Sequence, residues 1–341
     1  MTSVAGSTED GDRRNVSDAV GVLVLGASAT WSLITAAAHD GRPEGVLLAL
    51  LAVAAGYAAG RISGALLPVA APCAAALTGL GLAVGLPHLA PGPEIAPLGH
   101  AGATAALLTL ATGAACCAAW TTGSPALRLL LRLMAVGIAV ASAALGSVSG
   151  LVTCAAVLLC SLAAGQMRHR GPGIAGLILA ATAVTGLTWA VAGNAVPDGL
   201  AESLRGRLTP HRIGLWHDAL GLAREDTALG VGPGRFGGLS TTAAQSPLPD
   251  GKPHSAPLQM AAEQGLVGAL LLGAAFCWLL YALWRSARST PVVLTAGAAL
   301  TALAAIAAVG NALSFTMVSV GAGLLAGLAT AHPLTEEPAP K

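Results

Sequence analysis

The chain is 341 residues long; 55% of its residues are hydrophobic, 10% are charged, and its formal net charge is +1. A soluble domain carries about 25% charged residues, so this chain has too little polar side chain to cover a soluble surface, which excludes an ordinary soluble enzyme. A net charge near zero provides no electrostatic basis for binding DNA or RNA, which excludes nucleic acid as a partner.

The N-terminal segment is polar. Residues 1–18 contain Arg13 and Arg14 beside several acidic residues, and we expect a disordered cytoplasmic tail. The first apolar segment, 19–38, ends in A-A-A, which also fits a signal-peptidase site. Because this segment is longer than the apolar region of a typical signal peptide, we interpret it as a retained membrane helix.

Apolar segments of about the length of membrane helices recur along the chain. Seven precede a long polar segment and three follow it: 19–38, 44–60, 65–86, 100–120, 126–146, 149–164, 174–193, 258–283, 291–310 and 313–330. They are too uniformly apolar for barrel strands, which alternate, so we predict an all-α polytopic membrane protein with about ten transmembrane helices. Glycines four residues apart are typical of closely packed membrane helices. The chain has this spacing at Gly56/Gly60, Gly60/Gly64, Gly81/Gly85 and Gly323/Gly327.

The basic residues predict how these helices are oriented. With a cytoplasmic N-terminus, only Arg42 lies in a short outer connection, as the positive-inside rule expects. The cations at cytoplasmic ends are then Arg13, Arg14, Arg61, Arg128, Arg132, Arg168, Arg170, Arg285, Arg288 and Lys341. We therefore predict five segments: a cytoplasmic tail (1–18), seven helices (19–193), an extracytoplasmic loop (194–257), three helices (258–330) and a second cytoplasmic tail (331–341).

The loop 194–257 carries the candidate phosphate-binding residues. Thr209 and Pro210 predict a helix start, since Thr is a good N-cap and Pro is tolerated at the first helical position. The residues that follow form an amphipathic pattern in which Arg212 and Trp216 are neighbours on the helix surface. Guanidinium groups hold phosphate bidentately, and the loop offers Arg205, Arg207, Arg212 and Arg235. Charge alone fits contact with anionic headgroups equally well.

The end of the loop contains a candidate proton acceptor. Ser255 is positioned to cap the next membrane helix, which puts His254 beside a helix N-terminus. The positive end of the helix dipole disfavours imidazolium, so a neutral His254 suits the role of general base. Glu263 is an ionisable group inside a membrane helix and therefore a functional candidate. It is placed to orient His254, to pair with an arginine, or to reach interfacial water.

Three sequence blocks follow one another: R-I-G-L-W-H-D-A-L (212–220), L-G-V-G-P-G-R-F (229–236) and H-S-A-P-L-Q-M-A-A-E-Q-G-L-V-G (254–268). The middle block predicts a rigid turn. Together they resemble the signature of the O-antigen ligase / O-antigen polymerase superfamily of polytopic membrane glycosyltransferases. The family usually has His-Asn where this chain has His254–Ser255; Asn and Ser cap helices about equally well.

The resemblance implies glycan transfer at the outer face of the cytoplasmic membrane. Members move a glycan from an undecaprenyl diphosphate carrier to an acceptor hydroxyl on a glycan or lipid, without a metal or other cofactor. It makes His254 the base and Arg212 the group that offsets charge on the departing diphosphate. The substrate-binding candidates are Arg205, Arg207, Trp216, Arg235, Ser255 and Glu263. Attack opposite the diphosphate would invert the anomeric centre, and the motifs do not separate a ligase from a polymerase.

A membrane transporter of a small solute or of a cell-envelope precursor is the alternative, and a scaffold or flippase-like partner is a third interpretation. Transporters place ionisable groups near the bilayer midplane, often at broken helices. In this chain Arg132 is the main charged candidate within an apolar segment, and the dense polar site lies in the loop. That distribution favours chemistry at the membrane surface.

Overall fold

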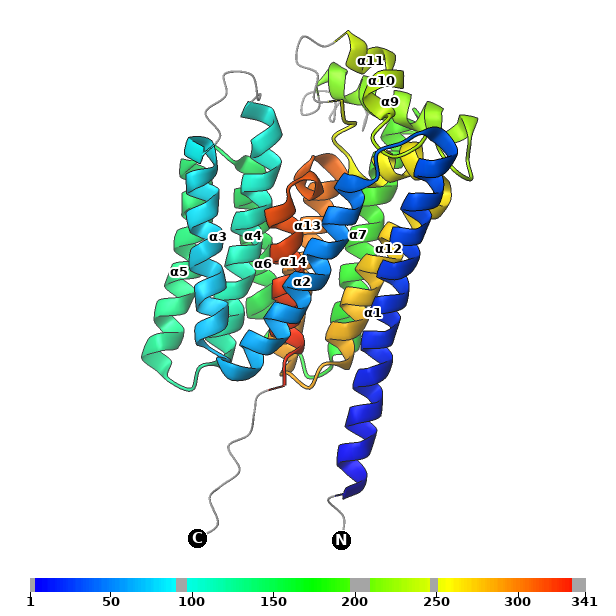
Figure 1. Cartoon of the computed structure of the whole chain (residues 1–341). Coiled ribbons are helices and arrows are strands. Elements are labelled where there is room, and N and C mark those ends of the chain that lie inside the picture. Colours follow the sequence, from blue (N-terminus) through cyan, green and yellow to red (C-terminus); the bar gives the residue numbers. More distant parts are fainter. Residues whose placement is uncertain (1–3, 90–96, 197–208, 246–250, 333–341) are drawn as a thin grey trace, which may run out of the picture.

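The computed structural model describes residues 4–89, 97–196, 209–245 and 251–332, and within these ranges the secondary structure is helical, with no strand. The helices form one bundle, and α9, α10 and α11 lie at one end of it (Figure 1). Their bounds are α1 (Val4–His39), α2 (Glu44–Leu66), α3 (Ala70–Leu89), α4 (Pro97–Thr121), α5 (Pro125–Ala144), α6 (Val148–Ala164), α7 (Arg170–Ala192), α9 (Pro210–Glu225), α10 (Phe236–Leu239), α11 (Thr241–Ala244), α12 (Ala256–Arg285), α13 (Thr290–Val309) and α14 (Thr316–Thr330), with a short 3-10 turn η1 (Ala312–Ser314). The predicted all-α class is confirmed.

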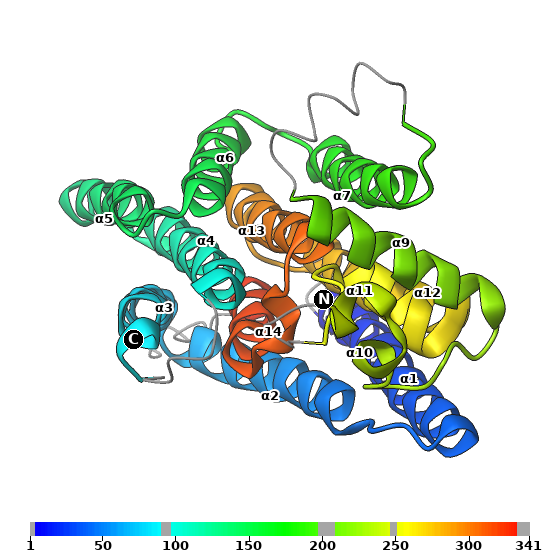
Figure 2. The same cartoon turned by 90° about the horizontal axis from the view of Figure 1, so that it is seen from above.

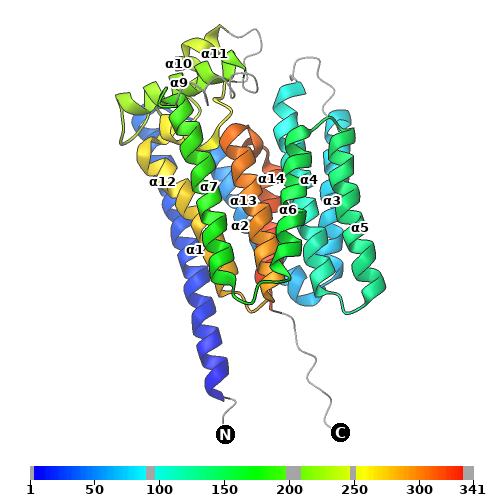
Figure 3. The same ribbon diagram turned by 180° about the vertical axis from the view of Figure 1, so that it is seen from behind.

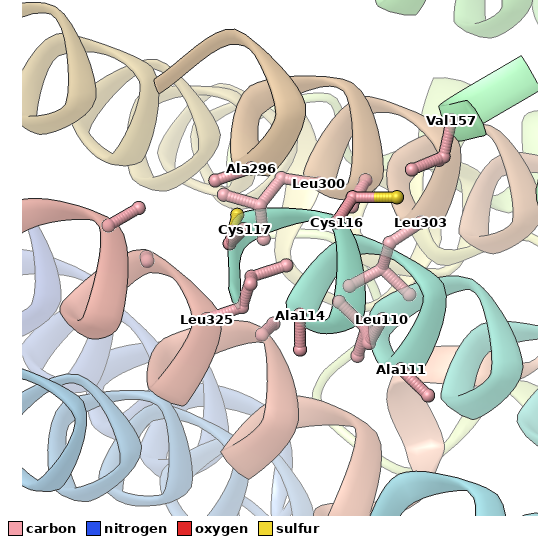
Figure 4. Packing of buried hydrophobic residues seen from close by; sticks show 14 of the residues in the cluster. Leu110, Ala111, Ala114, Cys116, Cys117, Val157, Ala296, Leu300, Leu303 and Leu325 are labelled. Atoms are coloured by element: carbon pink, nitrogen blue, oxygen red, sulfur yellow. The ribbon is translucent and has the colours of Figure 1, made fainter. Parts of the chain in front are cut away.

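Helix α4 is the most enclosed of the long helices, and its residues 103–119 are all buried. Its small side chains let α13 and α14 approach closely: a Cβ added to Gly113 would lie 2.6 Å from Ala299 Cβ and 3.3 Å from Leu325 Cδ2. Leu110, Ala114, Leu300 and Leu325 belong to one cluster of buried side chains (Figure 4). Close packing of small residues is how helices associate in lipid, where apolar burial gives little driving force between them.

Large apolar side chains cover the outside of the bundle. Val22, Val148 and Leu179 are exposed by 72%, 72% and 70%, a surface that soluble monomers rarely present and that lipid would cover. Seven helices are long and apolar enough to cross a membrane, namely Val16–His39, Glu44–Leu66, Ala101–Thr121, Pro125–Ala144, Arg170–Ala192, Ala256–Arg285 and Thr290–Val309. Shorter apolar helices cover the other three predicted segments. The protein is therefore consistent with a polytopic membrane protein, while ten crossings stays a prediction.

The glycine spacing marks the contact between α2 and α14. A Cβ added to Gly60 would lie 2.2 Å from the carbonyl oxygen of Leu324, and one added to Gly327 would lie 2.2 Å from that of Tyr57. Gly56 and Gly323 make equally close approaches, so these predicted glycine contacts are confirmed. Gly81 meets nothing within 4 Å, so its predicted helix contact is wrong.

Two segments differ from the sequence prediction. The N-terminal segment predicted as a disordered tail is helical from Val4 onward, because it continues the apolar helix and so needs no new helix nucleus. Helix α12, predicted as a regular helix over 258–283, is interrupted at Gly265, which has a left-handed φ of 67°. Seen from behind, α12 and α7 both reach the end of the bundle where α9 lies (Figure 3).

Candidate functional site

Helix α9 begins where the sequence predicts. The Thr209 side chain accepts a hydrogen bond from the backbone N–H of Arg212 at 3.4 Å, and Pro210 is the first helical residue. The buried face consists of Leu215, Trp216, Ala219, Leu220 and Ala223. The predicted amphipathic helix is thus confirmed, and it lies across α12 at the end of the bundle (Figure 2).

The three sequence blocks meet in one hydrophobic cluster. Trp216 from α9, Phe236 from the start of α10, and Leu258 and Ala262 from α12 all belong to it. Trp216 and Phe236 are almost fully enclosed, with exposures of 1% and 0%. The cluster therefore joins segments that are separated in the sequence and sets the positions of the polar residues beside them.

The glycine-rich turn occupies the interruption in α12. The backbone N–H of Val231 donates to Ala262 O and that of Gly232 donates to Glu263 O, each at 2.9 Å. Leu266 N–H donates to Thr227 O at 2.8 Å. Non-helical backbone within a membrane is tolerated where protein surrounds it, and here the turn supplies the partners that the broken helix lacks.

A long-range contact also supports the interruption. The indole Nε1 of Trp31 on α1 donates to Gln264 O at 2.9 Å. A Cβ added to Gly265 would lie 2.2 Å from Ala228 O, and one added to Gly230 would lie 2.6 Å from Ala262 O. The rigid turn predicted from the glycine-rich block is therefore a piece of backbone packed against backbone, which requires glycine on both sides.

Glu263 binds this turn. Its side chain is 2% exposed and accepts hydrogen bonds from the backbone N–H groups of Gly234 and Phe236 and from Gln259 Nε2, the last at 3.3 Å. Because the carboxylate is buried, the suggestion that it reaches interfacial water is wrong. Its contacts make it a positioning residue that fixes the turn and, through Phe236, the cluster.

Asp218 is a site residue that the sequence analysis missed. Its carboxylate accepts from Ser240 Oγ at 2.7 Å and from the backbone N–H of Thr242 at 2.9 Å, so it ties α9 to α11. Burial acts to raise the pKa of Asp218, but the hydrogen bonds from Ser240 and Thr242 outweigh it and lower the pKa below its ordinary value. No spacing in the sequence signals this contact, because its partners follow 22 and 24 residues later.

The predicted arginines have different environments. Arg212 is half-buried, and its burial lowers the pKa of the guanidinium, which means that the group is partly stripped of water. Arg235 is exposed and its Nη1 donates to His39 O at 2.6 Å, so it anchors the turn to the end of α1. Arg205 and Arg207 lie outside the described residues. Of the four predicted arginines, Arg212 is therefore the one that the structure places on the same helix as Trp216.

His254 and Ser255 precede α12 directly. His254 is half-buried and has a left-handed φ of 52°, a conformation that costs energy for a residue other than glycine. Ser255 is the N-cap of α12 by position, but its side chain makes no capping hydrogen bond. Its hydroxyl is buried without a partner among the described residues, and so is Trp216 Nε1. Ser255 is thus at the predicted cap position, but the capping hydrogen bond is absent. Its hydroxyl and Trp216 Nε1 are buried polar groups that a ligand or water can satisfy.

An apolar cavity lies elsewhere in the bundle. It measures about 480 Å³ and lies between α2, α3, α4 and α14, where Leu67, Leu107 and Val320 are among its lining residues. No residue of α9 or α12 lines it, so it is not a groove beside His254. Among the described residues no group of three or more His, Cys, Asp and Glu side chains is arranged to hold a metal ion.

Comparison with protein-family models finds no match, and comparisons with curated proteins and with solved structures find no significant match.

Proposed function

We propose that the chain is an O-antigen ligase-like membrane glycosyltransferase, which transfers or polymerises a glycan carried on undecaprenyl diphosphate. The observation that carries this proposal is the convergence of the three motif blocks on the cluster of Trp216, Phe236, Leu258 and Ala262. The same three blocks carry the resemblance to one family, and each of them contributes a buried side chain to this cluster.

Arg212 is the donor for the diphosphate. A partly desolvated guanidinium gains more from an anion than one in bulk water, because the local dielectric constant is lower. Its position on α9 is fixed by the buried face of that helix and by the Thr209 cap. It offsets the negative charge that builds on undecaprenyl diphosphate as the bond from the anomeric carbon to the diphosphate oxygen breaks.

His254 is the base. Its imidazole accepts the proton of the acceptor hydroxyl while that oxygen forms the new bond to the anomeric carbon, and the electron pair of the broken bond leaves with the diphosphate. It lies one residue before the N-cap of α12, near the positive end of the helix dipole, which favours the neutral imidazole that a base requires. Attack from the face opposite the diphosphate inverts the anomeric centre.

The test is complementation of a deletion strain. We expect the deletion to accumulate undecaprenyl diphosphate-linked glycan, measured by mass spectrometry of extracted lipids. His254→Ala should lower the transfer rate roughly 10²–10⁴-fold, and Arg212→Ala roughly 10²–10³-fold. The matched controls are His211→Ala and Arg224→Ala, because both residues are exposed on α9.

The controls should clear the accumulated glycan, whereas the two site variants should not. Full clearance by His254→Ala, or a deletion strain that accumulates no carrier-linked glycan, would reject the proposal.

Transport remains the second candidate because one observation favours it. Helix α12 is interrupted inside its membrane-spanning length and carries a buried carboxylate, Glu263, at the interruption, as transporters often do. Against it, the backbone groups of the interruption are bound by the protein's own turn. Purified protein in detergent micelles separates the two, since transfer from carrier to acceptor needs no closed compartment and transport does.

A further inference from the structure

The end of the bundle opposite α9 contains a polar cavity of about 420 Å³, a volume within the range of small-molecule sites. Residues from α1, α2, α7, α12, the α12–α13 connection and the end of α14 line it. They include Ser17, Asp18, Arg61, Arg170, Arg285 and Ser286. This cavity is separate from the candidate glycosyltransferase site and plays no part in the mechanism proposed for it.

The cavity has a surplus of positive charge. Three guanidinium groups line it, and of the described lining residues only Asp18 is acidic. Asp18 pairs with Arg61, whose Nη1 lies 2.6 Å from Oδ2. The charges of Arg170 and Arg285 are therefore not balanced by a carboxylate of the lining, and an anion is the complementary ligand.

The chain holds one of these guanidinium groups in a fixed position. Arg170 donates through Nη1 to Ser286 O at 2.7 Å and to Trp284 O at 3.3 Å. Carbonyl oxygens orient a guanidinium without neutralising its charge. A fixed, uncompensated cation binds an anion with little ordering cost, and arginine suits the oxygens of phosphate in particular.

The aromatic side chains beside the cavity are of the kind found at the depth of lipid headgroups. Trp284 lines it and is 49% exposed, and its ring centroid lies 6.2 Å from that of Tyr281. An exposed tryptophan beside a half-buried tyrosine at the end of an apolar helix is typical of the membrane–water interface. Arg285, next in the chain, is exposed at the mouth of the same cavity.

We propose that this cavity binds the phosphate group of an anionic phospholipid headgroup at the membrane face opposite α9. Arg285 contacts the phosphate from the mouth of the cavity, and Arg170 supplies the positive potential behind it. The proposal does not depend on the glycosyltransferase activity.

Native mass spectrometry of the purified full chain in detergent tests this proposal, with phosphatidylglycerol and phosphatidylcholine as the lipid probes. We expect retention of phosphatidylglycerol over phosphatidylcholine. Arg285→Gln should weaken phosphatidylglycerol binding by roughly tenfold, the loss expected of one hydrogen bond between charged groups. The matched control is Arg168→Gln, because Arg168 is exposed in the α6–α7 connection and does not line the cavity.

Asp18→Asn should change phosphatidylglycerol binding in the direction opposite to that of Arg285→Gln. It removes the one acidic group of the described lining, so it should tighten phosphatidylglycerol binding, whereas a purely structural role for the Asp18–Arg61 pair predicts no gain. Equal losses in Arg285→Gln and Arg168→Gln would show general attraction to basic residues and overturn the site. Binding of inorganic phosphate with displacement of the lipid would assign the cavity to a soluble phosphate and overturn the lipid proposal.

Discussion

The two ends of the helix bundle use polar groups in different ways. At the end opposite α9, Arg288 is buried and donates to Ala331 O and Gly64 O, each at 2.7 Å, so the chain itself satisfies it. At the α9 end, buried polar atoms of Trp216, Ser255 and Gln264 have no partner among the described residues. Buried polar groups in folded proteins are nearly always satisfied. At the opposite end Arg128 Nε also has no partner among the described residues, so the contrast holds between particular side chains. The chain itself satisfies Arg288, whereas Trp216 Nε1 and Ser255 Oγ can bind a substrate or water.

The ends also differ in how glycine is used. At the α9 end, Gly265 and Gly230 have left-handed backbone and let a turn enter a broken helix. Toward the other end, Gly60 and Gly327 are ordinary helical residues that bring α2 and α14 together. Gly265 and Gly230 are needed both for a positive φ and because a Cβ would clash with neighbouring backbone, whereas Gly60 and Gly327 are needed only because a Cβ would clash.

The largest expected effect is that of Gly265→Ala. The substitution adds a left-handed non-glycine residue and a clash with Ala228 O, so we expect a loss of about 3 kcal/mol or more in stability. The measurement is thermal unfolding of the purified protein in detergent.

Gly273→Ala is its control in the same helix, because nothing lies within 4 Å of the added Cβ. That variant should be unchanged or slightly more stable. A Gly265→Ala protein as stable as the control would contradict the interruption of α12.

Gly327→Ala should have a smaller effect at the other end of the bundle. The helical backbone accepts alanine, so the disturbance is confined to the contacts of the added Cβ with the backbone of α2, namely Tyr57 O at 2.2 Å, Arg61 N at 2.8 Å and Gly60 Cα at 3.0 Å. Helix α2 must therefore move away from α14. We expect a loss of roughly 1–3 kcal/mol from overpacking, measured by the same thermal unfolding. Gly137→Ala, where the added Cβ meets nothing, is the control and should not lower stability.

Acidification should loosen α9 from α10 and α11. The folded-state pKa of Asp218 is lowered from its ordinary value of 3.8. The ionised carboxylate therefore contributes its full stabilisation above pH 3.8, and this stabilisation is lost as the pH falls through the folded-state pKa. Hydrogen exchange of the α11 amides, relative to the exchange rate of an unstructured chain at the same pH, should accelerate roughly tenfold as the pH falls from 3.8 to below the folded-state pKa.

Asp218→Asn checks the assignment of that titration. The variant should exchange faster at neutral pH and lose the pH dependence in α11. An unchanged pH profile in the variant would show that another group titrates.

The smallest expected effect is that of Ser255→Ala. Because the hydroxyl is buried and caps nothing, its removal should leave stability unchanged or raise it by up to about 1 kcal/mol. The same variant should lower glycan transfer in the complementation assay if the hydroxyl contacts substrate. A clear loss of stability would instead mean that the hydroxyl caps α12 in solution.

Part of the candidate site could be predicted from local sequence. The Thr209–Pro210 start and the apolar spacing around Trp216 specify α9, because capping and helical periodicity act within a few residues. The role of Glu263 could not be predicted, because its partners lie in a turn about 30 residues earlier in the chain. The opposite cavity was also missed, because its arginines are dispersed across α2, α7 and α12.

The sequence alone determined the class of the protein, the apolar segments that form the helices and the amphipathic helix α9, since composition and periodicity are properties of neighbouring residues. Only the tertiary structure decided where α12 is interrupted, what Glu263 and Asp218 bind, and which arginines share a cavity. These features depend on contacts between distant parts of the chain, as in the bond from Trp31 to Gln264 across 233 residues. No local pattern encodes such a contact, because packing of the whole bundle sets it.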